Sequence, residues 1–237
     1  MPAPQSRRER PAKPALTREG IIDTAVRLME EEGLQRVTMR RLALALDTGP
    51  ASLYVYVANA AELHAGILDR LLSRADLAAA TATGDWRDRL DAVLASYERV
   101  LFAHPALAHS ALISRPSGPN YLALLETLLD LLDEGQVPAG QAAWGVDLLL
   151  QTATVSAAEH SARQENARAD EEWSQLTTAL ASASPDINPH IHAQAAELVS
   201  GTPDERRRWS VAMLLNGITA TPRPVAEQRA EGSDPTE

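Results

Sequence analysis

Apolar residues recur at helical spacing in one segment after another along this 237-residue chain. In residues 17–33 they fall mostly three or four positions apart, an interval that places side chains on one face of an α-helix. Thr17 and Gly33 flank this pattern, and these residue types favour the start and the end of a helix. No segment gives a convincing strand pattern, so the sequence predicts an all-α fold.

The same spacing predicts further helices toward the C-terminus. Asn59 and Asp85 are placed to cap two of them. The predicted segments are 38–46, 50–57, a long helix from 59, 85 to about 103, 119–134, 138–163, 189–200 and 203–219. Residues 164–188 are polar, with several Ser and Asn and one Pro, and this composition predicts a mobile loop.

Composition divides the chain into four parts. Residues 1–15 are rich in Pro and charge and predict a disordered basic arm, because they bury too little apolar surface to become ordered. Residues 16–62 form a compact three-helix unit and 63–220 a larger helical domain. A disordered tail is expected over 221–237.

Several classes of protein are disfavoured. The chain has no Cys, so it has no disulfide framework and no thiolate metal site. It has no apolar run of about eighteen residues to cross a membrane, and its first residues lack the apolar core of a signal peptide. We therefore expect a soluble, cytoplasmic protein.

The charge is unevenly distributed. The whole chain carries −10, yet residues 1–46 hold nine Arg or Lys against six acidic residues, and the remainder carries −13. A basic end on an acidic body suits contact with phosphates. A solubilising tail would give the same asymmetry, and charge alone does not separate the two.

The segment "LDTGPASLYVYVANAAEL", residues 46–63, contains a run that by itself could be a short strand. Its position between two predicted helices favours a third, short helix. Leu53 and Val57, four residues apart, would then share the face that packs on the preceding helices. The opposite side would display polar and aromatic groups, and such a three-helix unit is a helix-turn-helix.

The displayed groups suit double-stranded DNA. Hydroxyl groups can donate hydrogen bonds to phosphates, and an Arg can pair with guanine. Alternatively, the two tyrosines pack in the core and Arg40 is a solvated surface charge. The candidate DNA-binding residues are Thr38, Arg40, Thr48, Pro50, Ala51, Ser52, Tyr54, Tyr56 and Ala60.

Residues 17–63, with "GLQRVTMRRLALAL" and "SLYVYV", resemble the DNA-binding domain of the tetracycline-repressor (TetR) family, and a weaker resemblance continues to about residue 219. It implies a transcriptional regulator, a repressor that a small molecule releases from a palindromic operator. Asp47 stands where the family usually has Gly, and Ala60 where it usually has Lys. We expect the basic arm, with Arg7, Arg8, Arg10 and Lys13, to replace the lost phosphate contact.

The resemblance also implies a ligand pocket within the C-terminal helices. Its polar candidates stand out, because a buried polar group needs a partner that a ligand could supply. The groups that bind tetracycline and magnesium in the family's namesake are missing here, so a more apolar effector with one or two hydroxyl or carbonyl groups is expected. Each candidate could instead be an ordinary core residue. The candidates are Val93, Tyr97, Leu101, Ser114, Thr127, Trp144, Leu148 and Gln151.

By the same resemblance, the helices at 138–163 and 203–219 should pair across a two-fold axis in a homodimer. No catalytic motif, phosphate loop or dinucleotide turn is present, so we expect neither an enzyme nor a cofactor. His190 and His192, like Glu159 and His160, lack the further ligands of a metal site. The alternative is a helical module that binds small molecules or proteins without reading DNA.

Overall fold

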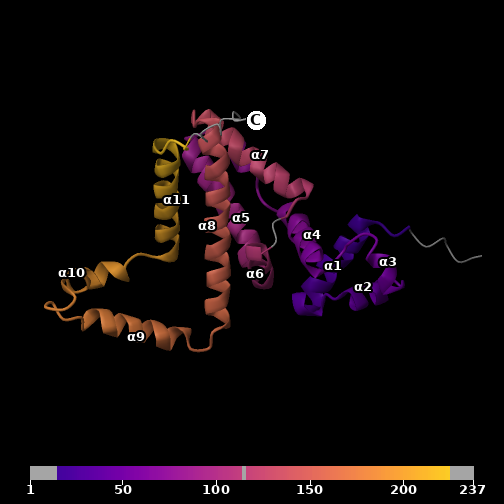
Figure 1. Cartoon of the computed structure of the whole chain (residues 1–237), viewed down its shortest axis with the longest axis horizontal. Helices are drawn as coiled ribbons and strands as arrows, with labels where there is room; N and C mark the ends of the chain where they lie inside the picture. The colour runs from indigo at the N-terminus through magenta and orange to yellow at the C-terminus, as the bar shows by residue number, and fades with distance from the viewer. Residues whose placement is uncertain (1–14, 114–115, 225–237) are drawn as a thin grey trace, which may run out of the picture.

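The computed structural model describes residues 15–113 and 116–224, and over these residues the chain contains helices and no strand (Figure 1). The predicted all-α fold is therefore confirmed. Short 3-10 helices at Leu34–Arg36 and Ala78–Thr81 supplement the α-helices. The α-helices are α1 Arg18–Glu32, α2 Met39–Ala45, α3 Pro50–Leu53, α4 Ala60–Leu72, α5 Trp86–Phe102, α6 Pro105–Ile113, α7 Pro119–Glu134, α8 Ala139–Glu165, α9 Ala169–Ala181, α10 Pro189–Leu198 and α11 Pro203–Ala220.

The helix starts follow the capping residues of the sequence. The hydroxyl of Thr17 accepts a hydrogen bond from the backbone N–H of Gly20 at 3.0 Å, and Thr38 accepts one from Arg41 at 3.1 Å. Asp85 and Asn59 cap α5 and α4 in the same way. Each cap satisfies a backbone donor that the first helical turn leaves unpaired.

The third helix is shorter than predicted. It covers one turn, and residues 54–56 continue as a turn rather than as helix. The backbone N–H of Val57 nevertheless donates to the carbonyl of Leu53 at 3.0 Å, so the chain keeps a helical path. Leu53 and Val57 are both fully buried, as predicted for the packing face. Before this helix, Asp47 has φ 49°, a left-handed conformation that Asp adopts more readily than most residues.

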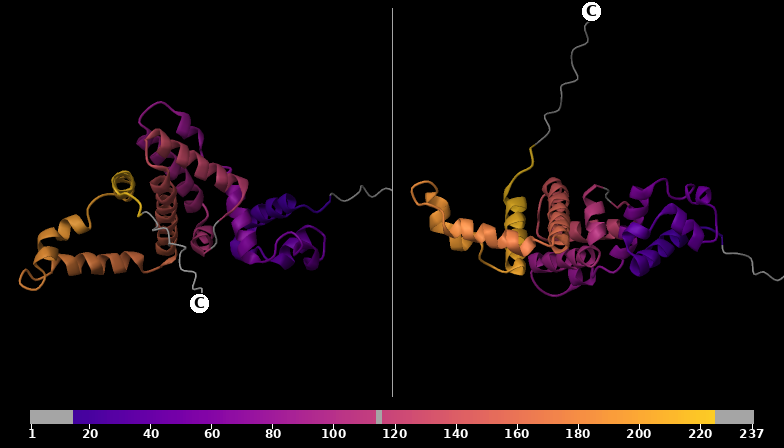
Figure 2. Two further views of the ribbon diagram at one scale, coloured as in Figure 1. Left: turned by 45° about the horizontal axis from the view of Figure 1, so that its top comes forward. Right: turned by 90° about the horizontal axis from the view of Figure 1, so that it is seen from below.

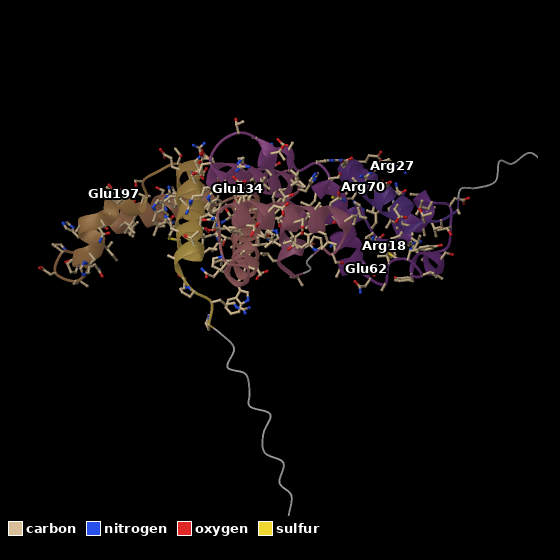
Figure 3. All side chains as sticks on the ribbon, turned by 90° about the horizontal axis from the view of Figure 1, so that it is seen from above. Arg18, Arg27, Glu62, Arg70, Glu134 and Glu197 are labelled. Carbon is tan, nitrogen blue, oxygen red and sulfur yellow. The ribbon has the colours of Figure 1, made fainter. Side chains whose placement is uncertain are left out.

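Helix α4 joins the head, formed by α1–α3, to the body, formed by α5–α11. Two ion pairs link it to α1, Arg18 with Glu62 at 3.7 Å and Asp23 with Arg70 at 2.6 Å, and a third joins Glu30 of α1 to Arg74, two residues beyond the end of α4, at 2.7 Å. Figure 3 shows that Arg18 and Glu62 lie together at this contact. On its other sides α4 packs against α5, α6 and α7, so one helix belongs to both halves of the chain.

One prediction for the C-terminal half is wrong. Residues 164–188 do not form a loop, because α8 continues to Glu165 and α9 occupies Ala169–Ala181. The overlooked signal is Trp173, Leu176 and Leu180, an apolar stripe at helical spacing among polar residues. Helices α9 and α10 pack on each other, contain no buried residue and project from the body on the side away from the head (Figure 2).

An ion pair of Arg207 links α11 to α5. Its guanidinium donates to both carboxylate oxygens of Asp91, at 2.7 and 2.9 Å. Glu98 lies 3.6 Å from the same guanidinium and is 4% exposed. Burial raises the pKa of Glu98 to about 7, although Arg207 opposes this shift. Burial dominates because a carboxylate loses its hydration in the interior, and the ion pair with Arg207 is long.

We expect Leu53→Ala to lower the free energy of unfolding by about 2–5 kcal/mol, because it opens a cavity at a fully buried site. Leu44→Ala is the matched control, since Leu44 is 74% exposed and its truncation should change stability by less than about 0.5 kcal/mol. Thermal or urea unfolding measures both. Equal losses in the two variants would contradict the packing described for α3.

Glu98→Gln tests the buried carboxyl group. Folded Glu98 holds its proton to about pH 7, whereas an ordinary Glu releases it near 4.5, so the folded chain loses stability as the pH rises from 4.5 to 7. Gln does not titrate, so the Gln variant does not lose stability in this way as the pH rises. The free energy of unfolding of the variant, relative to that of the parent chain, should therefore increase across this window. The increase should reach at most about 3 kcal/mol, at roughly 1.4 kcal/mol per pKa unit, and stay constant above pH 7. A difference that does not depend on pH would contradict this account.

Candidate DNA-reading surface and ligand cavity

All nine candidate DNA-binding residues lie on the surface of the head or at its junction with α4. Thr48 is half-buried and the other eight are exposed. The structure brings Thr38, Arg40, Thr48 and Pro50 together around one surface hollow, which α2 and the start of α3 form between them. Ala51, Ser52, Tyr54 and Tyr56 follow along the chain, and Ala60 begins α4.

Two neighbouring arginines on α2 differ in their surroundings. Arg41 is held by the carboxylate of Glu32, to which its Nε donates at 3.1 and 3.2 Å. This hydrogen bond lowers the pKa of Glu32. Arg40 is exposed and has no ion-pair partner within residues 15–113 and 116–224. Its guanidinium is therefore available for a phosphate or a base, whereas that of Arg41 is already engaged.

The tyrosines lie on the surface. Tyr54 is 53% exposed and Tyr56 is 36% exposed, while the packing that they could have provided comes from Leu53 and Val57. Their hydroxyl groups can reach a ligand at the surface of the head. Thr38 keeps a hydroxyl proton for donation, because its cap uses the oxygen only as an acceptor.

Two apolar residues on this surface were missed. Val55 is 80% exposed and Leu44, which lines the hollow, is 74% exposed. Helical spacing by itself favours burial of such residues, and only the packed structure shows that they face outward. Both offer apolar contact of the kind that thymine methyl groups accept in the major groove.

Position 60 presents a backbone group in place of a side-chain cation. Ala60 is exposed at the start of α4, where first-turn N–H groups lack partners within the helix and suit a phosphate. The residues proposed to compensate for the missing Lys, Arg7, Arg8, Arg10 and Lys13, lie outside the described residues.

A cavity of about 80 Å³ lies between α5, α6, α7 and α8, and it opens to the surface, because residues such as Leu112 and Gln151 in its lining are exposed. Two of the eight candidate ligand residues, Tyr97 and Gln151, line it. The hydroxyl of Tyr97 lies 2.7 Å from that of Thr154, which itself donates to the carbonyl of Leu150 at 2.7 Å. Because a threonine has one hydroxyl proton, Tyr97 is the donor to Thr154. No sequence pattern singled out Thr154.

Five other candidates do not line the cavity. Val93 and Leu101 are fully buried core residues that do not line the cavity. Thr127 on α7 donates its hydroxyl to the carbonyl of Ala123 at 2.7 Å. Trp144 and Leu148 are 57% and 42% exposed on the outer face of α8. Ser114 lies outside the described residues.

Trp144 and Leu148 instead line an apolar groove between α8 and α11. Met213 on α11, 49% exposed, lines the same groove. These helices are the two for which the sequence predicts pairing with a second copy. An exposed patch of this kind marks a surface that another apolar surface can cover.

Among residues 15–113 and 116–224, every helix is too short or too polar to span a membrane. The same residues contain no group of three His, Asp or Glu side chains that could hold a metal ion.

Both halves of the chain match models of one protein family. Residues 21–65 match the bacterial regulatory proteins of the tetR family, and 78–221 match the tetracyclin repressor-like C-terminal domain. The chain therefore belongs to the TetR family of DNA-binding transcriptional regulators.

Three relatives illustrate the similarity. The repressor DrrR1 of Streptomyces coeruleorubidus is 37% identical over 131 residues, which are 53% of this chain and 47% of that protein. The crystal structure of a proposed transcription regulator of Streptomyces coelicolor is 54% identical, with a TM-score of 0.76, and covers 91% of this chain and 100% of its own. ActR of the same species, in complex with actinorhodin, is 32% identical, with a TM-score of 0.75 and coverage of 87% and 97%.

The match to DrrR1, and a similar one to a transcriptional regulator of Saccharopolyspora erythraea, cover about half of each relative's length. The tetracycline repressor protein class C of Escherichia coli is matched over 90% of its length at 26% identity. The resemblance seen in the sequence thus extends over both helical halves.

The contrast between the two arginines gives a test on DNA. Arg40→Ala should weaken binding to a specific duplex by about 1–3 kcal/mol, the usual value of a good arginine contact to a base. Arg41→Ala is the matched control, with a smaller loss expected because Glu32 already engages Arg41. Fluorescence anisotropy at fixed salt measures both affinities. A larger loss for Arg41→Ala would reverse the assignment.

Proposed function

We propose that this chain is a homodimeric transcriptional repressor that leaves a palindromic operator when a small molecule occupies the body. The proposal rests on one observation: the segment after Pro50 has one buried side and one exposed side. Leu53 and Val57 are fully buried, while Tyr54, Val55 and Tyr56 are exposed beside the hollow that Arg40 lines. Only the exposed side is free to meet DNA, and such a protein acts in the cytoplasm.

The proposed dimer uses the apolar groove between α8 and α11, which a second copy would cover. Trp144, Leu148 and Met213 supply the apolar surface, and pairing of two helices from each copy gives a four-helix contact. A two-fold axis through this contact presents two heads to DNA. Each head reads one half-site, about one helical turn from the other, so the operator should be palindromic.

The proposed effector is a largely apolar molecule with one or two hydroxyl or carbonyl groups. Pockets for such ligands usually hold about 300–1,000 Å³, whereas this cavity holds about 80 Å³. We infer that such a ligand widens the cavity by moving the surrounding helices apart, and a ligand that favours the widened body shifts the population of head positions. Since ActR has been crystallised with actinorhodin, actinorhodin is the first compound to test.

The proposal is tested by selecting bound sequences from a random duplex library and titrating the selected duplex against salt. We expect a palindrome with half-sites roughly 10 base pairs apart. Between 50 and 200 mM salt, affinity should fall by roughly 10³-fold or more if the dimer contacts six to ten phosphates.

A second arm adds actinorhodin to the selected complex, and release of the duplex would support both the effector class and repression. If no sequence is enriched, the DNA-reading function is wrong. Release by tetracycline only in the presence of magnesium would contradict the apolar effector.

A further inference from the structure

Asp69 is a buried carboxylate at the contact between α4 and α7. It is 8% exposed. Its Oδ1 accepts a hydrogen bond from the backbone N–H of Tyr121 at 2.9 Å, and its Oδ2 accepts one from the side-chain amide of Asn120 at 3.2 Å. Both donors belong to the first turn of α7.

This carboxylate is the N-cap of α7, supplied by another helix. The residue at the N-cap position is Gly118, which has no side chain to cap the turn. A Cβ atom on Gly118 would overlap the carboxylate of Asp69, so the glycine at this position is what allows Asp69 to cap the helix. A local Ser or Asp would cap the helix equally well. Because the capping side chain belongs to α4, this cap also links α4 to α7.

The hydrogen bonds of Asp69 connect the wall of the cavity to α4, and through α4 to the head. Tyr121, whose backbone N–H donates to Asp69, lines the cavity. A second link has the same form, because His64 of α4 lies 3.0 Å, Nδ1 to Oγ, from Ser110 of α6, the residue before the cavity-lining Ala111. At its other face two of the ion pairs described above hold α4 to α1, and the third holds the residue two positions beyond the end of α4.

We propose that Asp69 is a positioning residue that couples the cavity to the DNA-reading head. When a ligand displaces the first turn of α7, the bonds from Tyr121 and Asn120 carry α4 with it, and the ion pairs carry α1. The inference rests on the proposed function, since it requires a head that reads DNA. Because coupling between two sites is reciprocal, DNA bound to the head must also change the first turn of α7.

Reciprocity allows a test with DNA as the only probe. The full-length chain is mixed with the selected duplex, and amide hydrogen exchange is followed in peptides that cover residues 119–125. In the unaltered chain, the duplex should change exchange in this turn by at least about fivefold, the low end of ordinary allosteric coupling. The melting temperature is recorded for each variant.

Three variants separate capping from coupling. Asp69→Ala should lower the melting temperature by roughly 2–4 °C for each kcal/mol of lost capping and abolish the response to DNA. Asp69→Ala with Gly118→Ser places a local cap in the vacated space, at an extended backbone position that Ser readily adopts. It should restore the melting temperature but not the response. Asp69→Asn keeps an acceptor for Tyr121 and should retain the response.

The outcomes are distinct. Recovery of the DNA response in the double variant would show that Asp69 is only a cap and would overturn the proposal. An unaltered chain that binds the duplex without any change in α7 would overturn it as well. If the unaltered chain binds no duplex, the proposed function is wrong, and the coupling proposed for Asp69 is wrong with it.

Discussion

Helix α4 packs in the cores of both halves of the chain, so its contacts set the position of the head relative to the body. Gly66 allows close contact with α1, since a Cβ atom there would lie 2.6 Å from Ile22 Cδ1. Leu63, Ile67 and Leu71 are buried along the same helix. Because interiors are close-packed, a shift of α4 cannot be absorbed locally and must move the elements on both sides. The reading surface is thereby placed by a helix that also contacts the walls of the cavity.

The head assigns stability and recognition to different residues of the same short segments. Leu53 and Val57 are buried and fix the turn that follows Pro50, while the tyrosines between them remain exposed. On α2, Arg41 is held by Glu32 and Arg40 is not. Binding of DNA to such a rigid framework costs little conformational entropy, because few side chains other than the exposed polar ones must become ordered.

The body contains a small cavity between α5, α6, α7 and α8 and an apolar groove along its outer face. The hydrogen bonds of Tyr97, Thr154 and Leu150 satisfy the polar groups on the cavity wall between α5 and α8. Arg207 ties α11 to α5, while the groove between α11 and α8 remains exposed and apolar. A drug-sized ligand would therefore have to widen the cavity, whereas a second copy would meet a groove that is already formed.

The all-α fold and most helix boundaries could be predicted from the sequence, because caps such as Thr17 and helical periodicity act locally. The buried pair Leu53 and Val57 was predictable too, since four-residue spacing places them on one face. The packing partner of each face was not, because it depends on how the helices come together. Val93 and Trp144 look equivalent in an apolar stripe, yet one lies in the core and the other on the surface. The partnership of Asp69 with Tyr121 was equally hidden, because it joins residues 52 positions apart. Periodicity reports that a face is apolar, and only the arrangement of the helices determines what covers it.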